Sequence, residues 1–276
     1  MSNPNFLAVM REKTTERLKK IKLEAQFLRD EAEKSARPAN FLDIFSRGQI
    51  EKLPACVITE IKFASPSLGQ ITQEQDYLKI AKQYLEQGSS ALSVLTESEY
   101  FKGSLDYLKN IRQVFPRARL LMKDFIQDEV QLFQARLAGA NAILLITDFL
   151  SPAQLQELYS IALELSLTPF IETHTQEQVE SAQAMGASLI GVNNRNLSTL
   201  KTDLATSKKM QIKQDEKTFF ISESGITSGY EIDELMQLGY HGFLIGGHLM
   251  TAHHPGEALK KLFHEVIDAR QNMRCD

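Results

Sequence analysis

The chain has 276 residues, 43% of them hydrophobic, which is enough to bury a large core and fits either two ordinary domains or one α/β barrel. Its formal charge of −4, with lysines and glutamates mixed along the chain, argues against a nucleic-acid-binding protein, which would carry a basic stripe. No apolar run reaches membrane-spanning length, so we expect neither a membrane nor a nucleic-acid partner.

The two cysteines, Cys56 and Cys275, lie far apart in the chain and have no metal-ligand spacing. They support neither a disulfide framework nor a zinc site. The N-terminus reaches charged residues too soon for a signal-peptide core. We therefore expect a cytoplasmic protein.

The first fifty residues precede any strand pattern. Thr14–Lys34 is predicted as a charged helix, Arg37-Pro38 interrupts it, and Phe41–Phe45 forms a short apolar patch. We interpret residues 1–50 as a helical N-terminal extension of a barrel formed by residues 51–276. A structural and a functional role are open for this extension: it either plugs the bottom of the barrel or covers exposed helices, or it forms a flap over the active-site face.

From about residue 55 onward, short apolar runs alternate with amphipathic stretches. The apolar runs predict eight strands, at Val57–Lys62, Ala91–Leu95, Arg119–Lys123, Ala142–Ile146, Pro169–Glu172, Leu189–Val192, Phe219–Ser222 and Gly242–Ile245. Helices are predicted between them at Gln75–Gln87, Leu105–Val114, Asp128–Ala138, Pro152–Leu165, Gln176–Met185 and Tyr230–Leu238. Four of these helices run into a glycine, as helix C-termini commonly do, at Gly88, Gly139, Gly186 and Gly239. Eight such units predict an α/β fold, a closed (β/α)₈ or TIM barrel, in preference to an open sheet.

An acid and a base close the first predicted strand. Glu60 and Lys62 are two residues apart, so on an extended strand both side chains lie on the face of Ile58. Burying such charges is costly unless they pair, meet a ligand or lie at a solvent-filled mouth. For this segment alone, a salt-bridged strand end and a functional site are equally good interpretations.

Other predicted strands end in polar residues too. Because active sites of (β/α)₈ barrels lie at the C-terminal strand ends, these residues are candidates for one site. They are Lys123 at the end of the third strand, Glu172 at the end of the fifth, Asn193 and Arg195 after the sixth, and Glu223 and Ser224 after the seventh. Two lysines, two or three glutamates and an arginine on one rim favour a functional site over a structural explanation.

Glycines close the last two units, at Gly225 and at Gly246-Gly247. Phosphate sites in these barrels commonly use the same two loops and the N–H groups of a following helical turn, here His248–Met250. Tight turns would explain either glycine motif alone, whereas both together favour a phosphate site. The histidines His248, His253 and His254 lack metal-ligand spacing, so we interpret them as surface or capping residues.

Motifs along nearly the whole chain, placed at successive strand ends, are similar to those of one enzyme family. They are Phe41–Phe45, Glu60–Gly69, Leu95–Glu97, Tyr100–Ser104, Lys123–Phe125, Ala138–Ala142, Ile171–His174, Gly191–Leu197, Ser222–Ile226 and Leu244–Met250. With these motifs the chain resembles indole-3-glycerol phosphate synthase, the ring-closing lyase of tryptophan biosynthesis.

The resemblance implies a small anionic substrate, 1-(2-carboxyphenylamino)-1-deoxyribulose 5-phosphate, and the products indole-3-glycerol phosphate, carbon dioxide and water, with no cofactor and no metal. Local cations must hold such a substrate in an acidic protein, and Lys62, Lys123 and Arg195 are available. We choose Lys123 as the general acid of ring closure. For the later dehydration Glu172 is the family's usual base, and Glu60 with Lys62 is a competing pair. The sequence does not apportion these roles.

The resemblance also implies which residues contact the substrate. Polar contacts are expected from Ser65, Asn193 and Arg195, and Glu223 is expected to orient Lys123 or a substrate hydroxyl. The phosphate is expected among Lys62, Ser224, Gly225, Gly246 and Gly247. The aromatic ring is expected against Phe101, Phe125 and Leu144, which are equally good core residues. Many relatives carry a serine or an acid at the position of Gly247, so we expect modestly weaker phosphate binding here.

Other functions remain open to the same fold. A flavin-binding barrel or a sugar-phosphate isomerase would share the phosphate site, but an isomerase of phosphoribosyl anthranilate would need a carboxylate and thiol pair that this rim lacks. A barrel that only binds a sugar phosphate would not need Glu60, Lys62, Lys123 and Glu172 together. The sequence does not determine the oligomeric state, for which we expect a monomer, with a weak dimer as the alternative.

Overall fold

Eight parallel strands close into a barrel in the computed structural model, which describes residues 6–50, 52–72, 74–197, 199–213 and 217–272. The strands are β1 (Val57–Ile61), β4 (Ala91–Leu95), β5 (Leu120–Lys123), β6 (Ala142–Ile146), β7 (Thr168–Thr173), β8 (Leu189–Asn193), β9 (Phe219–Glu223) and β10 (Gly242–Ile245). Each predicted strand is confirmed to within one residue at either end. Neighbouring strands follow the chain, and the barrel closes where β1 pairs with both β4 and β10. The predicted (β/α)₈ fold is confirmed.

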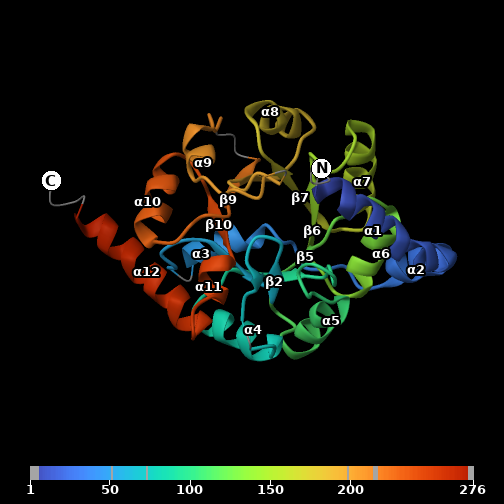
Figure 1. Ribbon diagram of the computed structural model, residues 1–276, viewed down its shortest axis with the longest axis horizontal. Coiled ribbons are helices and arrows are strands. Elements are labelled where there is room, and N and C mark those ends of the chain that lie inside the picture. Colours follow the sequence, from blue (N-terminus) through green and yellow to red (C-terminus); the bar gives the residue numbers. More distant parts are fainter. Residues whose placement is uncertain (1–5, 51, 73, 198, 214–216, 273–276) are drawn as a thin grey trace.

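Helices form an outer ring around the strands (Figure 1). The predicted ones are α4 (Tyr77–Glu86), α5 (Leu105–Val114), α6 (Glu129–Leu137), α7 (Pro152–Glu164), α8 (Gln176–Ala184) and α10 (Gly229–Gln237). Where a predicted helix begins too early, the extra residues include a cap: the Asp76 and Asp128 side chains accept hydrogen bonds from N–H groups of the first turn. The four predicted C-terminal glycines have φ between 84° and 98°, the left-handed conformation that ends a helix.

Further elements lie in the last third of the chain and in the loop after β1. They are α9 (Ala205–Lys209), α11 (Gly247–Met250), α12 (Pro255–Asn272) and the short antiparallel hairpin of β2 (Ala64–Ser65) and β3 (Gly69–Gln70). The helical turn predicted at His248–Met250 corresponds to α11. The sequence analysis did not predict α9, α12 or the hairpin.

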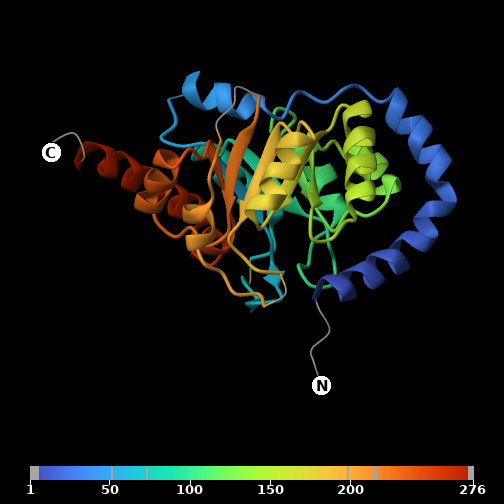
Figure 2. The same cartoon turned by 90° about the horizontal axis from the view of Figure 1, so that it is seen from above.

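The N-terminal extension runs along the outside of the barrel from one end to the other (Figure 2). It consists of α1 (Phe6–Ile21), a 3₁₀ turn (Lys22–Glu24), α2 (Ala25–Lys34) and α3 (Asp43–Ile50). The helix predicted from Thr14 therefore begins earlier, at Phe6, and the 3₁₀ turn divides it.

The two ends of the extension contact opposite ends of the barrel. At the N-terminal strand ends, the Phe45 ring in α3 stacks on Phe219, which begins β9, with 4.0 Å between ring centroids. At the C-terminal strand ends, Arg17 in α1 pairs with Asp124 at 2.7 Å, and Phe6 packs edge-on against Phe125. Thus α3 lies at the bottom of the barrel and α1 contacts the loop after β5, whereas a role of the extension as a flap over the active-site face stays a prediction.

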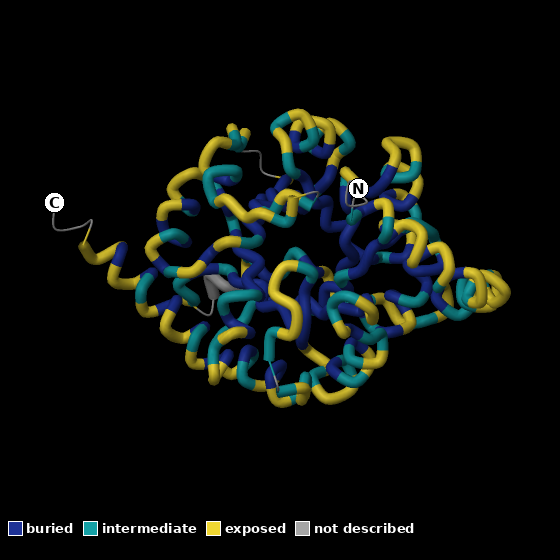
Figure 3. The backbone as a smooth tube through the Cα atoms, in the orientation of Figure 1, coloured by how far each residue is buried: buried dark blue, intermediate teal, exposed yellow. Residues whose placement is uncertain are grey.

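Burial is concentrated in the strands and in the inward faces of the helices (Figure 3). Every residue of the barrel strands is buried except Lys123, which ends β5, and Phe219, which begins β9, and these two are half-buried. Exposed residues lie on the outer faces of the helices. Among the described helices, none combines the length and hydrophobicity that crossing a bilayer requires. Cys56 is a free, half-buried thiol, and Cys275 lies outside the described residues.

Candidate active site

A cavity of about 410 Å³ opens at the C-terminal ends of the barrel strands, a size typical of small-ligand sites. Its wall includes most of the residues that the sequence analysis predicted for the site. These are Glu60, Lys62, Phe101, Lys123, Phe125, Leu144, Glu172, Asn193, Arg195, Ser224, Gly225, Gly246 and Gly247. The barrel therefore brings together charged, apolar and glycine positions that span almost 190 residues of sequence.

Two predicted residues lie outside this wall. Glu223 lies beneath it and reaches the cavity through Lys123. Ser65 lies in β2, where its hydroxyl accepts a hydrogen bond from the Leu68 N–H at 3.2 Å. That bond stabilises the turn of the hairpin, and the substrate contact assigned to Ser65 stays a prediction.

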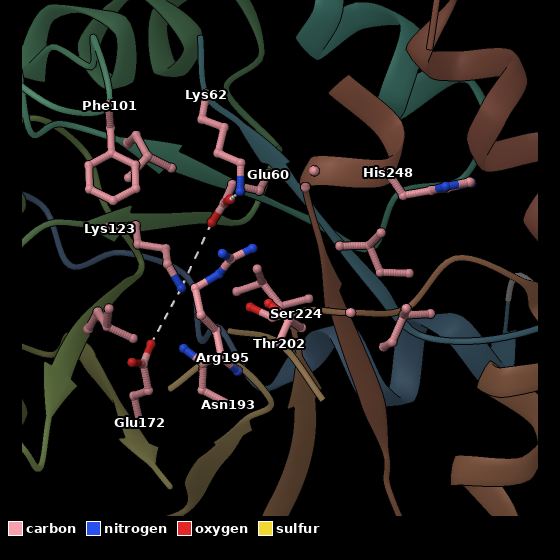
Figure 4. A pocket seen from close by; sticks show the side chains of 18 of the residues that line it. Glu60, Lys62, Phe101, Lys123, Glu172, Asn193, Arg195, Thr202, Ser224 and His248 are labelled. Atoms are coloured by element: carbon pink, nitrogen blue, oxygen red, sulfur yellow. Dashed lines mark hydrogen bonds and ion pairs between the residues drawn. The ribbon is translucent and has the colours of Figure 1, made fainter. Parts of the chain in front are cut away.

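Lys123 is surrounded by three carboxylates, two of which, Glu60 and Glu172, are shown in Figure 4. Its Nζ lies 2.9 Å from Glu223 Oε2, 3.6 Å from Glu172 Oε2 and 3.8 Å from Glu60 Oε2. Burial lowers the pKa of Lys123, but the three carboxylates outweigh burial and raise the pKa above its ordinary value. Lys123 therefore holds its proton firmly at neutral pH while its ammonium group borders the cavity.

The Glu60 carboxylate bridges two lysines. Its Oε1 lies 2.6 Å from Lys62 Nζ, and its other oxygen faces Lys123. Burial raises the pKa of Glu60, but the two ammonium groups outweigh burial and lower it. The strand-end salt bridge considered for this segment is thus present, and both of its members line the cavity.

Glu223 is fully buried, and its Oε1 has no hydrogen-bond partner. Burial raises the pKa of Glu223 to about 7, although the ammonium group of Lys123 opposes the shift. The carboxylate fits inside the barrel because the neighbouring strand carries Gly191, where an added Cβ would lie 2.0 Å from Glu223 Oε1. Gly191 on β8 has no side chain, and this leaves the space that the Glu223 side chain on β9 occupies.

Behind Glu172, two further titratable residues adjoin the site. His174 Nε2 lies 3.6 Å from Glu172 Oε1, and His174 Nδ1 lies 3.1 Å from Asp148 Oδ2. The sequence analysis included His174 in a family motif but gave it no role, and it did not mention Asp148. Neither residue belongs to the cavity wall.

Arg195 joins two loops at the mouth of the cavity. Its Nη1 donates to Ser67 Oγ in the loop after β1 at 2.8 Å and to the Leu200 carbonyl at 3.1 Å. Asn193 accepts the Arg195 backbone N–H at 2.9 Å, so the turn that follows β8 directs the arginine across the opening. A guanidinium held in this way presents its remaining donors to an anion.

The glycine turns also border the cavity. Ser224 and Gly225 both have positive φ, 67° and 81°, and the Asn194 amide fixes this turn by donating to the Glu223 and Ser224 carbonyls. The short helix α11 starts at Gly247, and Gly246 precedes it. Glycines and a helix start occur together here, as in phosphate sites.

The sequence analysis did not predict several residues of the cavity wall as site residues. They are Leu68, Leu95, Asp124, Ile146, Leu197, Thr202, Ile226, Thr227, Leu244, Ile245, His248 and Thr251. His248, interpreted as a surface or capping residue, borders the cavity. Thr202 lies nine residues beyond β8, and an antiparallel backbone bridge with Arg195 places it at the cavity wall. No local sequence pattern predicts such a bridge. Within the described ranges, no group of three or more His, Cys, Asp or Glu side chains is arranged to hold a metal ion.

Comparison with known proteins identifies the family. A family model described as indole-3-glycerol phosphate synthase matches residues 6–262. Relatives of that name include the proteins of Carboxydothermus hydrogenoformans, 44% identical over 75% of this chain and 78% of the relative, and of Desulforamulus reducens, 41% identical over 82% of each chain.

Solved structures with little sequence similarity share the fold. A 3-hexulose-6-phosphate synthase has a TM-score of 0.60 at 15% identity, covering 76% of this chain and 99% of the other. A thiamine phosphate pyrophosphorylase from Pyrococcus furiosus has a TM-score of 0.59 at 14% identity, covering 79% and 98%. These structures share the barrel alone, whereas the family model and the close relatives match the sequence itself. The chain belongs to the indole-3-glycerol phosphate synthase family.

Proposed function

We propose that this chain is an indole-3-glycerol phosphate synthase that closes the ring of 1-(2-carboxyphenylamino)-1-deoxyribulose 5-phosphate and releases carbon dioxide and water. Its membership of the family supports the reaction. The observation that carries the assignment of residues is the position of Lys123, which has three carboxylates within 4 Å and borders a cavity with phosphate-type glycine turns. A barrel that only bound a sugar phosphate would have no use for this acid–base cluster.

The substrate carries two anionic groups, and the cavity offers a matching partner for each. The phosphate binds at the turns of Ser224-Gly225 and Gly246-Gly247, with Lys62 as the nearby cation. The carboxylate binds toward Arg195, whose guanidinium group is well suited to paired contacts with carboxylate oxygens. Between them, the apolar side chains Phe101, Phe125 and Leu144 receive the aromatic ring.

Ring closure joins the aromatic carbon that bears the carboxylate to the ketone carbon. The electron pair of the C=O bond moves to oxygen, and Lys123 Nζ donates a proton to that oxygen. An alkoxide is a stronger base than an amine, so the raised pKa of Lys123 still allows this transfer. The C–C bond to the carboxylate then breaks, carbon dioxide leaves, and the electron pair restores the aromatic ring.

Dehydration removes the new hydroxyl as water and a proton from the neighbouring carbon. Glu172 is the base in this step. Glu60 is less suited, because the two lysines beside it lower its pKa and its Oε1 lies 2.6 Å from Lys62. Glu60 and Lys62 together remain the second candidate, because their contact joins a base to an acid. In that alternative, Lys62 donates the proton to the leaving hydroxyl.

An activity measurement on the purified chain tests the proposal. The chain is mixed with the substrate in the presence of a chelator, and indole fluorescence and carbon dioxide are followed together. We expect one carbon dioxide for each indole product. Binding of the substrate without either product would overturn the proposed reaction and favour a binding protein. A monomeric enzyme, or a weak dimer, that acts in the cytoplasm is part of the same proposal.

A further inference from the structure

We propose that His174, held by Asp148, is a positioning residue that keeps the Glu172 carboxylate turned so that its Oε2 faces the cavity. The inference rests on the proposed function, because it concerns the base of the dehydration step. His174 does not line the cavity, so it acts through Glu172 and not on the substrate.

The two oxygens of Glu172 face different basic groups. Oε2 lies 3.6 Å from Lys123 Nζ on the cavity side, and Oε1 lies 3.6 Å from His174 Nε2 on the outer side. A carboxylate between a lysine and a histidine ring is held in orientation by both, whereas with Lys123 alone it would be free to rotate about its last torsion. The outer contact therefore fixes which oxygen is presented to the substrate.

The His174 ring is itself placed by its neighbours. Both ring nitrogens are buried, and each faces a carboxylate, with Asp148 Oδ2 3.1 Å from Nδ1. Gln178 ties the arrangement to the start of α8, because its side chain accepts the His174 backbone N–H at 2.7 Å and donates to the Asp148 carboxylate. The same Gln178 completes a capping box with Thr175. Residues from β7, from the loop after β6 and from α8 thus converge on one imidazole.

The charge of this imidazole depends on pH. The groups that face it are Asp148 in the loop after β6, Glu172 on β7, Glu223 on β9 and the neutral amide of Gln178 on α8. Burial lowers the pKa of His174, but the Asp148 carboxylate, which faces Nδ1 as an acceptor, and the charge of Glu172 outweigh burial and raise the pKa above 6.5. The environment therefore favours the charged imidazole, which loses its charge as the pH rises through this raised pKa.

The test is His174→Gln, with the exposed His264→Gln on α12 as the matched control. Carbon dioxide release and indole formation are timed separately in single turnovers. We expect carbon dioxide release and KM to stay near wild type and the later appearance of indole to slow about tenfold, the usual scale for losing a partner that orients a functional side chain. We also expect wild-type kcat to decline as the pH rises through the raised pKa of His174, and His174→Gln to lack this decline.

Other results would overturn the proposal. His174 would be structural only if both steps slowed equally or KM rose in proportion, and it would have no role if indole appeared at the wild-type rate. Should His174→Gln fail to fold, Asp148→Asn, which preserves side-chain volume, must show the same selective slowing. If wild type and His264→Gln form no indole, the proposed function itself fails, an outcome distinct from failure of the His174 assignment.

Discussion

At the scale of single residues, the site depends on charges that the fold holds close together. Lys62, Lys123 and Arg195 are balanced by Glu60, Glu172 and Glu223, so the cluster has no formal net charge before an anionic substrate enters. Each carboxylate has an ammonium group within 4 Å. Removing one member therefore changes the protonation of the others, because buried charges are stabilised by their partners and not by water.

Lys123→Met tests the acid of ring closure. Methionine preserves much of the side-chain length but has neither charge nor proton, so we expect turnover to fall roughly a hundredfold or more, the scale of a lost general acid. Carbon dioxide release should stall in single turnovers, and substrate binding should fall less because other groups hold the phosphate and carboxylate. Lys260→Met, at a half-exposed lysine of α12, is the control. If carbon dioxide left at the wild-type rate and only dehydration slowed, Lys62 would be the first-step acid.

Glu223→Gln tests the buried carboxylate through stability. The pKa of Glu223 is raised from 4.5 to about 7 on folding, so the folded state binds more protons than the unfolded state in this range. Wild-type stability should therefore fall as the pH rises from about 4.5 to 7, by up to about 3 kcal/mol from this group, and glutamine removes that dependence. Urea unfolding at pH 5 and pH 8 measures it, with Glu86→Gln on the surface as the control. Parallel pH dependences of wild type and Glu223→Gln would contradict the raised pKa.

At the scale of elements, glycines near the strand ends leave the space that neighbouring carboxylate side chains occupy. Gly191 on β8 leaves space for Glu223 from β9, and Gly246 after β10 leaves space for Glu60 from β1. In a closed barrel, each inward side chain needs room that the neighbouring strand must leave free. These two glycines therefore decide whether carboxylates can reach Lys123 at all.

Gly246→Ala and Gly247→Ala form a matched pair that tests this packing. A Cβ at Gly246 would lie 2.5 Å from Glu60 Oε1 and 2.8 Å from Glu60 Cβ, whereas one at Gly247 would have no neighbour within 4 Å. We expect Gly246→Ala to displace Glu60 and to lower the free energy of unfolding by about 1–3 kcal/mol, as overpacking does. Gly247→Ala should unfold like wild type, within about 0.5 kcal/mol. Equal urea midpoints for the two variants would show that Glu60 tolerates the added methyl group.

At the scale of the whole molecule, the N-terminal extension contacts both ends of the barrel. Its α3 packs on residues that begin strands, and its α1 packs on the loops that follow them. Phe125, which lines the cavity, is in contact with Phe6 of the extension. The division at residue 50 is a prediction of the sequence, and these contacts suggest that both parts unfold together.

Phe41→Ala tests that cooperativity. The Phe41 ring is fully buried, so its loss should lower the free energy of unfolding by about 3–5 kcal/mol in a single transition of the whole chain. Phe27→Ala on the exposed face of α2, where the ring is 63% exposed, is the control and should change stability by less than about 0.5 kcal/mol. Two separate transitions, with only the first shifted by Phe41→Ala, would mean that the extension folds as an independent unit.

The sequence by itself determined the barrel and most of its rim. Strand and helix periodicities are local properties, and in this fold the end of every strand faces the same side, so Glu60, Lys123, Glu172 and Arg195 could be assigned to one site before any contact was known. Tertiary structure decided what those residues do to one another. Lys123 and Glu223 are 100 residues apart, and only barrel closure gives their 2.9 Å contact and the raised pKa of Glu223. The pairing of His174 with Asp148 and the path of α1 likewise depend on how loops pack. Such long-range packing produces no periodic pattern in the sequence, so the sequence could not predict it.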